Sequence, residues 1–291
     1  MTAPIAAASH PRPTGRLGRM LRTPMGAVGF TLLAVVLIAG LGAHWLAPAD
    51  PLRVNMTMTT VFQPPSAAHP FGTDNLGRDV FSRVIHGIGL SLGVAAAGVL
   101  AGVSAGVLTG ALAGMLGGLF ERIAMRLMDA LLAFPLLVLA IAISVALGRG
   151  PLGVLFAVAF VNLPIFARLA RGQTLRIMAM PYMTAAEVMG CSFGRRLFRH
   201  VLPNLVNPVV VQASVALSFA VLIEAGLSFL GMGLQPPQPA LGLMIAEAKA
   251  YIALAPHLVL FPSLALVLIV VSFNLIGDAL AEAGDIRRHS R

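Results

Sequence analysis

The sequence predicts an all-α integral membrane protein with six transmembrane helices and with both termini in the cytoplasm. Of its 291 residues, 58% are hydrophobic and 11% are charged, whereas a soluble domain carries roughly 25% charged residues. A helix needs about 20 apolar residues to cross roughly 30 Å of hydrocarbon. Six segments qualify, the fourth with help from arginines at its ends, and they span residues 26–46, 91–116, 128–147, 152–167, 207–230 and 257–276.

The positions of the basic residues predict the orientation. When the N-terminus is placed inside, fifteen arginines fall in the inner segments, whereas four arginines and Lys249 fall in the outer segments. Because Lys and Arg are enriched on the cytoplasmic side, both termini are expected there. This distribution also accounts for the net charge of +9 without nucleic acid, for which a basic groove interleaved with aromatic residues would be expected.

The second apolar segment carries a regular stripe of glycines. They recur every fourth residue, which is about 1.1 helical turns, so they lie along one slowly winding face. Small residues let membrane helices approach closely, and we therefore expect a helix-packing face rather than a pore lined by glycine backbone. The five residues are Gly98, Gly102, Gly106, Gly110 and Gly114.

An outer segment between the first two spans contains the stretch HPFGTDNLGRDVFSR, residues 69–83. Apolar residues recur here every four positions, which is typical of an amphipathic helix. We expect Asp74 to cap this helix. Arg78 and Asp79 are expected on its polar face, with an ion pair between Asp79 and Arg83. A metal site formed by His69, Asp74 and Asp79 is the alternative, but their spacing matches no recognised site.

Few catalytic groups are present in the sequence. A P-loop needs a lysine after glycine, and the chain's one lysine, Lys249, follows an alanine. No HExxH motif occurs, and no GxSxG stretch lies at a strand-to-helix turn, where a nucleophile elbow would be expected. Glu224 is the one carboxylate well inside an apolar segment, and an ionisable group in that position is a functional candidate. The chain is therefore expected to be neither an ATPase nor another enzyme, and no catalytic or metal-binding residue is assigned.

A polar segment separates the fourth and fifth spans on the cytoplasmic side. Its sequence TAAEVMGCSFGRRLFRHVLPN predicts a short helix that ends at Gly190 in left-handed geometry. A second short helix is expected to be capped by Ser192 and to end at Pro203. A basic helix lying on anionic lipid is the simple interpretation, and a docking element for a cytoplasmic partner is the specific one.

This segment resembles the coupling loop of ABC importer permeases. The family pattern is Glu-Ala-Ala, three residues, Gly, nine residues, an aliphatic residue, any residue, and then Leu-Pro. Two positions depart from it, since Thr184 replaces the glutamate and His200 replaces the aliphatic residue, while Glu187 lies one helical turn beyond Thr184 and can supply a carboxylate. The matching positions are Ala185, Ala186, Gly190, Leu202 and Pro203.

Other stretches resemble one branch of that family, the dipeptide, oligopeptide and nickel permeases in their second-subunit form. They are HPFGTDNLGRDVFSR, MDALLAFP, EAGLSFLGMGLQPPQP and FNLIGDAL, and they extend over residues 69–280. The C-terminal AEAGDIRRHSR lacks the acidic residue, proline and arginine with which the family usually ends.

The resemblance implies a type I ABC importer fold in the bacterial inner membrane. The chain would be one permease of a heterodimer with a homologous permease, assembled with two cytoplasmic ATPase subunits and an extracytoplasmic solute-binding protein. ATP and Mg²⁺ would be bound by the ATPase subunits, and no cofactor by this chain. The coupling loop would insert into an ATPase subunit, with Arg195 and Arg196 among its residues, whereas Asp74, Arg78, Asp79 and Glu224 are candidates for facing the binding protein or forming a gate.

The implied organisation is a cytoplasmic tail (residues 1–25), a first span with its outer segment (26–90), a permease domain (91–280) that contains the coupling loop (168–204), and a second cytoplasmic tail (281–291). Di- or oligopeptides are the expected solutes, because most members of the family carry them, and nickel or another small solute is the alternative. Two other classes stay open. A secondary transporter would show inverted repeats with interrupted helices, and a membrane scaffold or enzyme would transport nothing.

Overall fold

A computed structural model describes residues 23–57 and 59–289 of the chain. Within those residues the structure is helical, with no β-strand and one isolated bridge between Thr73 and Asp79. Five helical segments there are long and apolar enough to cross a membrane. They are α2 (Pro24–Leu41), α4 (Val80–Leu116), α7 (Pro151–Met178), the continuous run Phe193–Phe229 that ends in α10 (Leu202–Phe229), and α12 (His257–His289).

The third predicted span is not one straight helix. Residues 118–147 form α5 (Gly118–Leu132) and α6 (Leu136–Leu147), which meet at an angle of 100°. Proline lacks the N–H that continues a helix and disfavours helical geometry in the residue before it, and Pro135 lies directly before α6. The bent pair adds a sixth candidate crossing if its two helices act as one span.

The glycine stripe of α4 lies against α7. A Cβ atom added at any of the five positions would lie within 3.0 Å of an α7 atom. At Gly102, Gly106 and Gly110 the nearest α7 atom is a backbone carbonyl oxygen. The backbones of the two helices are therefore in direct contact over four turns, which only glycine allows without a shift of one helix.

A second set of contacts joins α10, α12 and α2. Ser218 Oγ on α10 donates to the carbonyl of Val270 on α12 at 3.3 Å, and Gly29 on α2 lies against the backbone of α12 at Leu275 and Ile276. Fully buried residues such as Ala220 and Ile269 fill the space between the helices. This packing places α4, α7, α10 and α12 around one apolar core.

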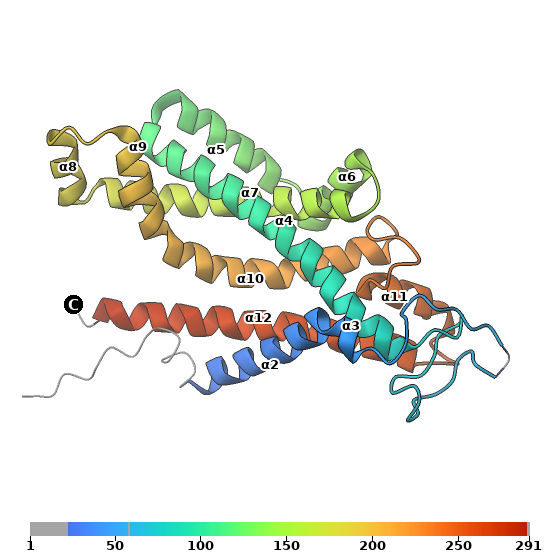
Figure 1. Cartoon of the computed structure of the whole chain (residues 1–291). Helices are drawn as coiled ribbons and strands as arrows, with labels where there is room; N and C mark the ends of the chain where they lie inside the picture. Colours follow the sequence, from blue (N-terminus) through green and yellow to red (C-terminus); the bar gives the residue numbers. More distant parts are fainter. Residues whose placement is uncertain (1–22, 58, 290–291) are drawn as a thin grey trace, which may run out of the picture.

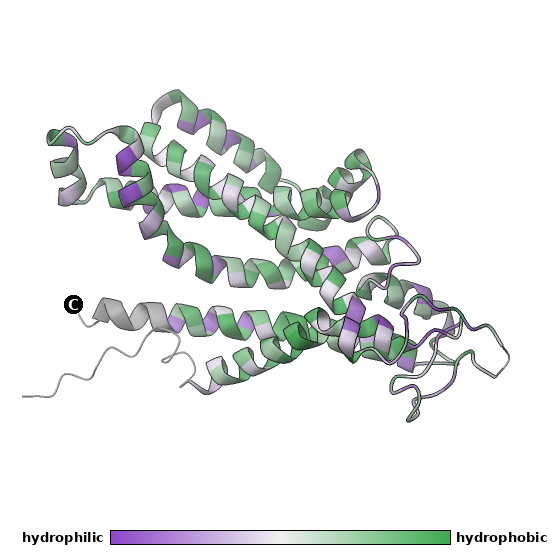
Figure 2. Cartoon of the chain, in the orientation of Figure 1, coloured by the Kyte–Doolittle hydropathy of each residue, from purple (hydrophilic) through white to green (hydrophobic). Residues whose placement is uncertain are grey.

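The two ends of the molecule differ in content (Figure 1). At one end lie α8 (Pro181–Val188), α9 (Phe193–Arg196), the beginning of α2 and the end of α12. At the other end lie the loop 47–79, α3 (Ala43–Leu46), α11 (Leu241–Ala248) and the short turn η2 (Lys249–Tyr251). Figure 2 shows hydrophilic residues gathered at both ends, with apolar helices between them.

The predicted terminal tails are covered only in part. Residues 1–22 of the N-terminal tail lie outside the described residues, including the four arginines that precede the first span. At the other terminus α12 continues to His289, so the predicted tail 281–291 begins as an extension of the last helix.

Candidate functional site

The segment that resembles a coupling loop forms a helical hairpin, residues 181–201, called here the α8–α9 hairpin. Gly190 has a φ of +74° and follows the end of α8. Its N–H donates to Glu187 O and the N–H of Cys191 donates to Ala186 O, both at 2.9 Å. This pair of bonds is the Schellman arrangement that ends a helix at a left-handed glycine, and the predicted role of Gly190 as helix terminator is confirmed.

The second helix of the hairpin differs from the prediction. The Ser192 side chain makes no capping hydrogen bond, and the helix does not end at Pro203. One turn of π-helix (η1, Leu197–Val201) joins α9 to α10, and the N–H of Leu202 donates to Leu197 O, five residues back. Pro203 follows in the first turn of α10 and lacks the N–H that would continue the backbone hydrogen bonding of this run.

An apolar face anchors the hairpin to the membrane helices. Met183, Leu197 and Val201 are buried and belong to one cluster with Ala111 of α4 and Ala170 of α7. Burying a large apolar side chain stabilises a protein by about 1.5–3 kcal/mol. The hairpin is therefore held rigidly on α4 and α7 rather than attached only at its ends.

The opposite face of the hairpin is open. Val188 and Met189 are 83% and 84% exposed at the tip, and Phe198 is 68% exposed. A Cβ atom on Gly190 would meet no atom within 4 Å. Exposed apolar residues gathered on a stiff projection mark an interaction surface.

The residues predicted to form the coupling loop lie on or near that face. Glu187 Oε1 pairs with Arg196 Nη1 at 3.0 Å and closes the hairpin across its tip. Thr184, Ala185 and Arg195 are exposed, as is Pro203 at the base, while Ala186 and Leu202 are half-buried. Because Glu187 is still 63% exposed in its pair, its carboxylate can also reach a partner.

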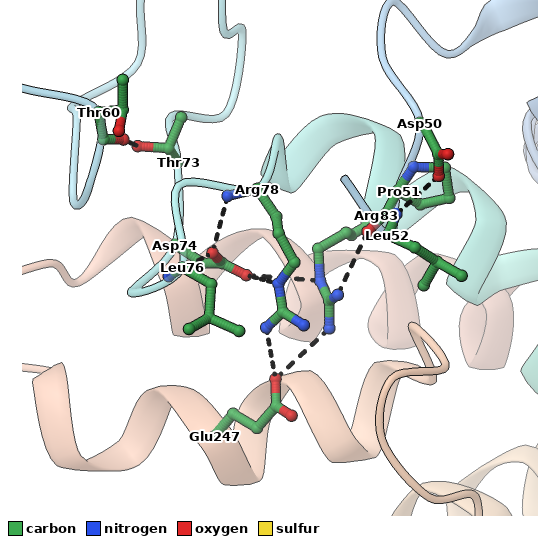
Figure 3. A network of polar contacts seen from close by, with 10 residues as sticks. All are labelled: Asp50, Pro51, Leu52, Thr60, Thr73, Asp74, Leu76, Arg78, Arg83 and Glu247. Atoms are coloured by element: carbon green, nitrogen blue, oxygen red, sulfur yellow. Dashed lines mark hydrogen bonds and ion pairs between the residues drawn. The ribbon is translucent and has the colours of Figure 1, made fainter. Parts of the chain in front are cut away.

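At the other end of the molecule three buried charged side chains, Asp74, Arg78 and Arg83, and the half-buried Glu247 form a group called here the ionic cluster (Figure 3). Arg78 Nε donates to Asp74 Oδ2 at 2.6 Å, and Arg83 Nε lies 3.6 Å from the same oxygen. Arg78 Nη2 and Arg83 Nη2 both donate to Glu247 Oε2 on α11, at 3.2 and 3.4 Å. Two positive and two negative charges balance within the cluster, which joins the loop 47–79 and α4 to α11.

Asp79 has a different role from the predicted one. It is the N-cap of α4, where its Oδ2 accepts from the backbone N–H of Ser82 at 2.8 Å. Its Oδ1 lies 2.9 Å from His69 Nδ1. The prediction of Asp74 as N-cap is therefore wrong, and the predicted pair between Asp79 and Arg83 does not form, because Arg83 pairs with Asp74 and Glu247 instead.

The charged residues of this region are buried, although the sequence placed them on the polar face of an amphipathic helix. Asp74, Arg78 and Asp79 are 7%, 4% and 3% exposed, because the loop 47–79 and α11 cover the start of α4. These side chains hold the end of the molecule together and do not present its surface to a partner. Glu247 was missed by the sequence reasoning, and no local signal pointed to it, because residues 47–90 contain three arginines and three acidic residues. Within the described part of the chain, no three His, Cys, Asp or Glu side chains are placed to hold a metal ion.

Glu224 lies fully buried near the end of α10. Its Oε1 accepts from Ser228 Oγ at 2.8 Å, and Ser228 Oγ accepts from the backbone N–H of Leu234 at 3.1 Å. The backbone of α11 at Gly242 lies directly against that of α10 at Ala225. Glu224 therefore belongs to the joint between α10 and the loop 230–240 and faces neither a partner nor the aqueous phase in this structure.

Comparisons with known proteins agree with this arrangement. The family model described as binding-protein-dependent transport system inner membrane component matches residues 106–288, which is more than half of the chain. A glutathione transport system permease protein GsiD from Pectobacterium atrosepticum is 42% identical over 259 residues, which cover 89% of this chain and 85% of the relative. Proteins of the same name from Escherichia coli O1:K1 and Shigella flexneri serotype 5b are 40% and 42% identical over 267 residues, which cover 92% of this chain and 88% of each relative.

The family model covers the end of α4 and every later helix, including the α8–α9 hairpin and α11. The relatives, at about 40% identity, extend the match to about nine tenths of the chain. The chain belongs to the binding-protein-dependent ABC importer permeases of the bacterial inner membrane, in the branch of the peptide importers.

Proposed function

We propose that the chain is one of two homologous permease subunits of an ATP-driven importer for short peptides, and that the α8–α9 hairpin receives the motion of an ATPase subunit. The observation that supports this proposal is that the hairpin has one buried apolar face and an exposed apolar tip. Its apolar anchor of Met183, Leu197 and Val201 is buried, whereas Val188 and Met189 are exposed at its tip. A stiff, anchored projection with an open apolar tip suits the transfer of a mechanical displacement.

The proposed orientation places the hairpin in the cytoplasm. The excess of arginines in the segments on that side supports it, as does the location of the beginning of α2 and the end of α12 at the hairpin end (Figure 1). With this orientation the bent pair α5 and α6 makes the sixth crossing. The ionic cluster and α11 then lie outside, below the surface that a solute-binding protein would contact.

The energy source is proposed to lie in separate subunits. The sequence has no P-loop, so ATP and Mg²⁺ are assigned to two cytoplasmic ATPase subunits. Thr184 is exposed, and Glu187 is only partly engaged by Arg196. We assign to these two residues the contact that the family makes with its glutamate.

A short peptide is the solute that the comparisons favour. The similar permeases from three bacteria are named for glutathione transport, and glutathione is itself a tripeptide. Nickel is the alternative within the same branch. Uptake of labelled glutathione, a dipeptide and Ni²⁺ by the complete importer, each with saturating binding protein, separates these solutes, and uptake of Ni²⁺ alone would replace the peptide assignment.

The coupling role is tested with Met189→Glu in the assembled importer reconstituted in liposomes. Because Met189 is 84% exposed, the substitution leaves the fold of this subunit intact but places a charge in the proposed docking surface. We expect ATP-dependent uptake to fall at least tenfold. Met189→Leu is the matched control, since it keeps an apolar side chain of similar volume at the same exposed position.

Normal ATP-driven uptake by the Met189→Glu importer would contradict the coupling role of the hairpin. Uptake that persists after ATP depletion, as long as an ion gradient remains, would instead indicate a secondary transporter. A complete importer with no flux of any solute would point to a scaffold.

A further inference from the structure

A cavity of about 170 Å³ lies between α6, α7 and α10, well away from the hairpin and the ionic cluster. Its volume is many times the roughly 10–15 Å³ that one water molecule requires. Most of its lining is apolar, including Leu136, Phe219 and Ile223, but two side-chain amides also line it, Asn162 on α7 and Gln212 on α10. Phe219 is 55% exposed and Leu136 is 41% exposed, so the cavity opens on the surface of the subunit.

The two amides lie at membrane depth. Asn162 is eleven residues from the beginning of α7 at Pro151, which is about 16 Å at 1.5 Å per residue, or half of the hydrocarbon thickness. Gln212 is likewise in the interior of α10, ten residues from Leu202 and seventeen from Phe229. A polar side chain in the hydrocarbon region is costly unless it is paired or faces a polar cavity.

The hydrogen-bonding capacity of these amides is left largely unused. Asn162 is 3% exposed, and its Nδ2 donates to Val158 O on its own helix at 2.8 Å, while its Oδ1 makes no hydrogen bond within the described residues. Gln212 makes no side-chain hydrogen bond within that part of the chain. In contrast, the hydroxyls of Ser214 and Ser218 on the same helix donate to Val210 O and Val270 O.

The chemistry of the lining selects one class of ligand. An amide side chain offers a donor and an acceptor without charge, and these groups complement the N–H and C=O of a peptide bond. The lining contains no charged side chain and no histidine or cysteine, which are the groups that would favour a free carboxylate or a transition-metal ion. The apolar remainder tolerates side chains of many shapes, as the transport of varied peptides requires.

We propose that Asn162 and Gln212 form a peptide-binding subsite on the translocation path, at which the two side-chain amides bind main-chain N–H and C=O groups of the passing substrate. This inference rests on the proposed function as a peptide importer and adds the residues that contact the substrate within the membrane. The binding protein selects the peptide, and this subsite replaces the water that the peptide backbone loses when it enters the bilayer.

The test compares Gln212→Leu with wild type in the complete importer, in liposomes and with saturating binding protein, so that selection by that protein does not limit the rate. The probes are labelled trialanine and its backbone N-methylated analogue, which lacks N–H donors. Loss of one or two hydrogen bonds is expected to lower trialanine uptake per ATP hydrolysed roughly three- to tenfold. The variant should also lose most of the discrimination between trialanine and the N-methylated peptide.

Ser214→Ala is the matched control, because Ser214 lies two residues from Gln212 and bonds only to its own helix. Its uptake should equal that of wild type. A second measurement uses the chain's one cysteine, Cys191. In a Cys191→Ser background, Gln212→Cys should react with a small water-soluble thiol reagent, and saturating trialanine should slow that reaction.

The inference is overturned if Gln212→Leu takes up both peptides at wild-type rates, or if Gln212→Cys stays unreactive in the working importer. Loss of the permease heterodimer in Gln212→Leu would also overturn it, because the amide would then bind the second permease. These results differ from failure of the proposed function, in which the wild-type importer itself would show no ATP-dependent peptide uptake.

Discussion

The α8–α9 hairpin and the ionic cluster lie at opposite ends of the molecule and use charge in opposite ways. In the hairpin the carboxylate of Glu187 is exposed, at 63%, although its partner Arg196 is only 14% exposed, and most of the burial comes from apolar anchors such as Met183. In the ionic cluster the charges themselves are buried, with the side chain of Arg83 at 1%.

This difference shows how each end is stabilised. A buried charge is tolerated only with its full set of partners, so the ionic cluster is complete within this chain and stabilises its fold. The hairpin is stabilised by apolar contacts on one face, and its other face is free to contact a second protein. Substitutions at the cluster should therefore act on stability, whereas substitutions at the hairpin tip should act mainly on coupling.

The largest effect is expected for Arg83→Met in the ionic cluster. The substitution leaves Asp74 and Glu247 with one arginine between them, and an unpaired buried charge costs about 3–5 kcal/mol. The melting temperature of the purified permease complex should fall clearly. Arg53→Met is the control, because Arg53 is exposed in the same outer loop and should change the free energy of unfolding by no more than about 0.5 kcal/mol. Equal melting temperatures for the two variants would show that the cluster does not stabilise this end.

The next largest loss of stability is expected in the membrane-spanning part, where the glycines of α4 contact α7. This contact is called here the α4–α7 seam. Gly110→Ala places a methyl group against the carbonyl oxygen of Ala167, and such overpacking costs about 1–3 kcal/mol. Gly93→Ala is the control on the same helix, since a Cβ atom there meets nothing within 4 Å. Thermal unfolding in detergent should show a loss of stability for Gly110→Ala alone. Similar changes in melting temperature for both variants would mean that α4 and α7 can move apart at this contact without loss of stability.

A smaller effect is expected for Gly190→Ala at the tip of the hairpin. The left-handed backbone costs about 1–2 kcal/mol for a residue with a Cβ atom, even though the space around Gly190 is open. Amide hydrogen exchange in α8 should accelerate roughly 5- to 30-fold, while melting of the whole complex changes little. Gly194→Ala, also in open space but at an ordinary φ, should leave exchange unchanged. Unaltered exchange in Gly190→Ala would show that the tip conformation is not held by its glycine.

The smallest effect is expected for Glu187→Gln, which removes the exposed carboxylate that pairs with Arg196. Exposed ion pairs contribute about 0–1 kcal/mol and are weakened by salt, so exchange in α8 should rise no more than about fivefold and the difference should vanish in high salt. A larger increase in exchange that does not depend on salt would show that this pair stabilises the fold, as the ionic cluster does.

Much of the helical framework could be predicted from the lengths of the apolar segments, because α4, α7, α10 and α12 each cover one predicted span to within one residue. The bend between α5 and α6 could not. Four prolines lie inside predicted spans, and three of them, Pro164, Pro208 and Pro262, lie inside continuous helices. Whether a proline breaks a membrane helix depends on the neighbouring helices that satisfy the freed backbone groups, and that information is not local.

The candidate sites were predictable to different degrees. The hairpin follows from a local signal, since a glycine between two short helical patterns specifies its own turn. The ionic cluster does not, because Glu247 is 169 residues from Arg78 in the sequence, and no local pattern shows that charged residues at the start of α4 are covered by α11. Asn162 and Gln212 are visible as isolated amides in apolar segments, but their common cavity depends on how α7 packs on α10.

The π-helical turn at Leu197–Val201 has a mechanical consequence. It joins α9 to α10 with no loop between them, and Figure 1 shows that the helical run changes direction there. Helices kink at π-turns and at prolines, and Pro203 follows this turn directly. A displacement of the hairpin is therefore passed to α10 through a helical elbow. Glu224 and Ser228 lie near the far end of α10, so opening or closing of the elbow would tilt the part of the helix that carries them.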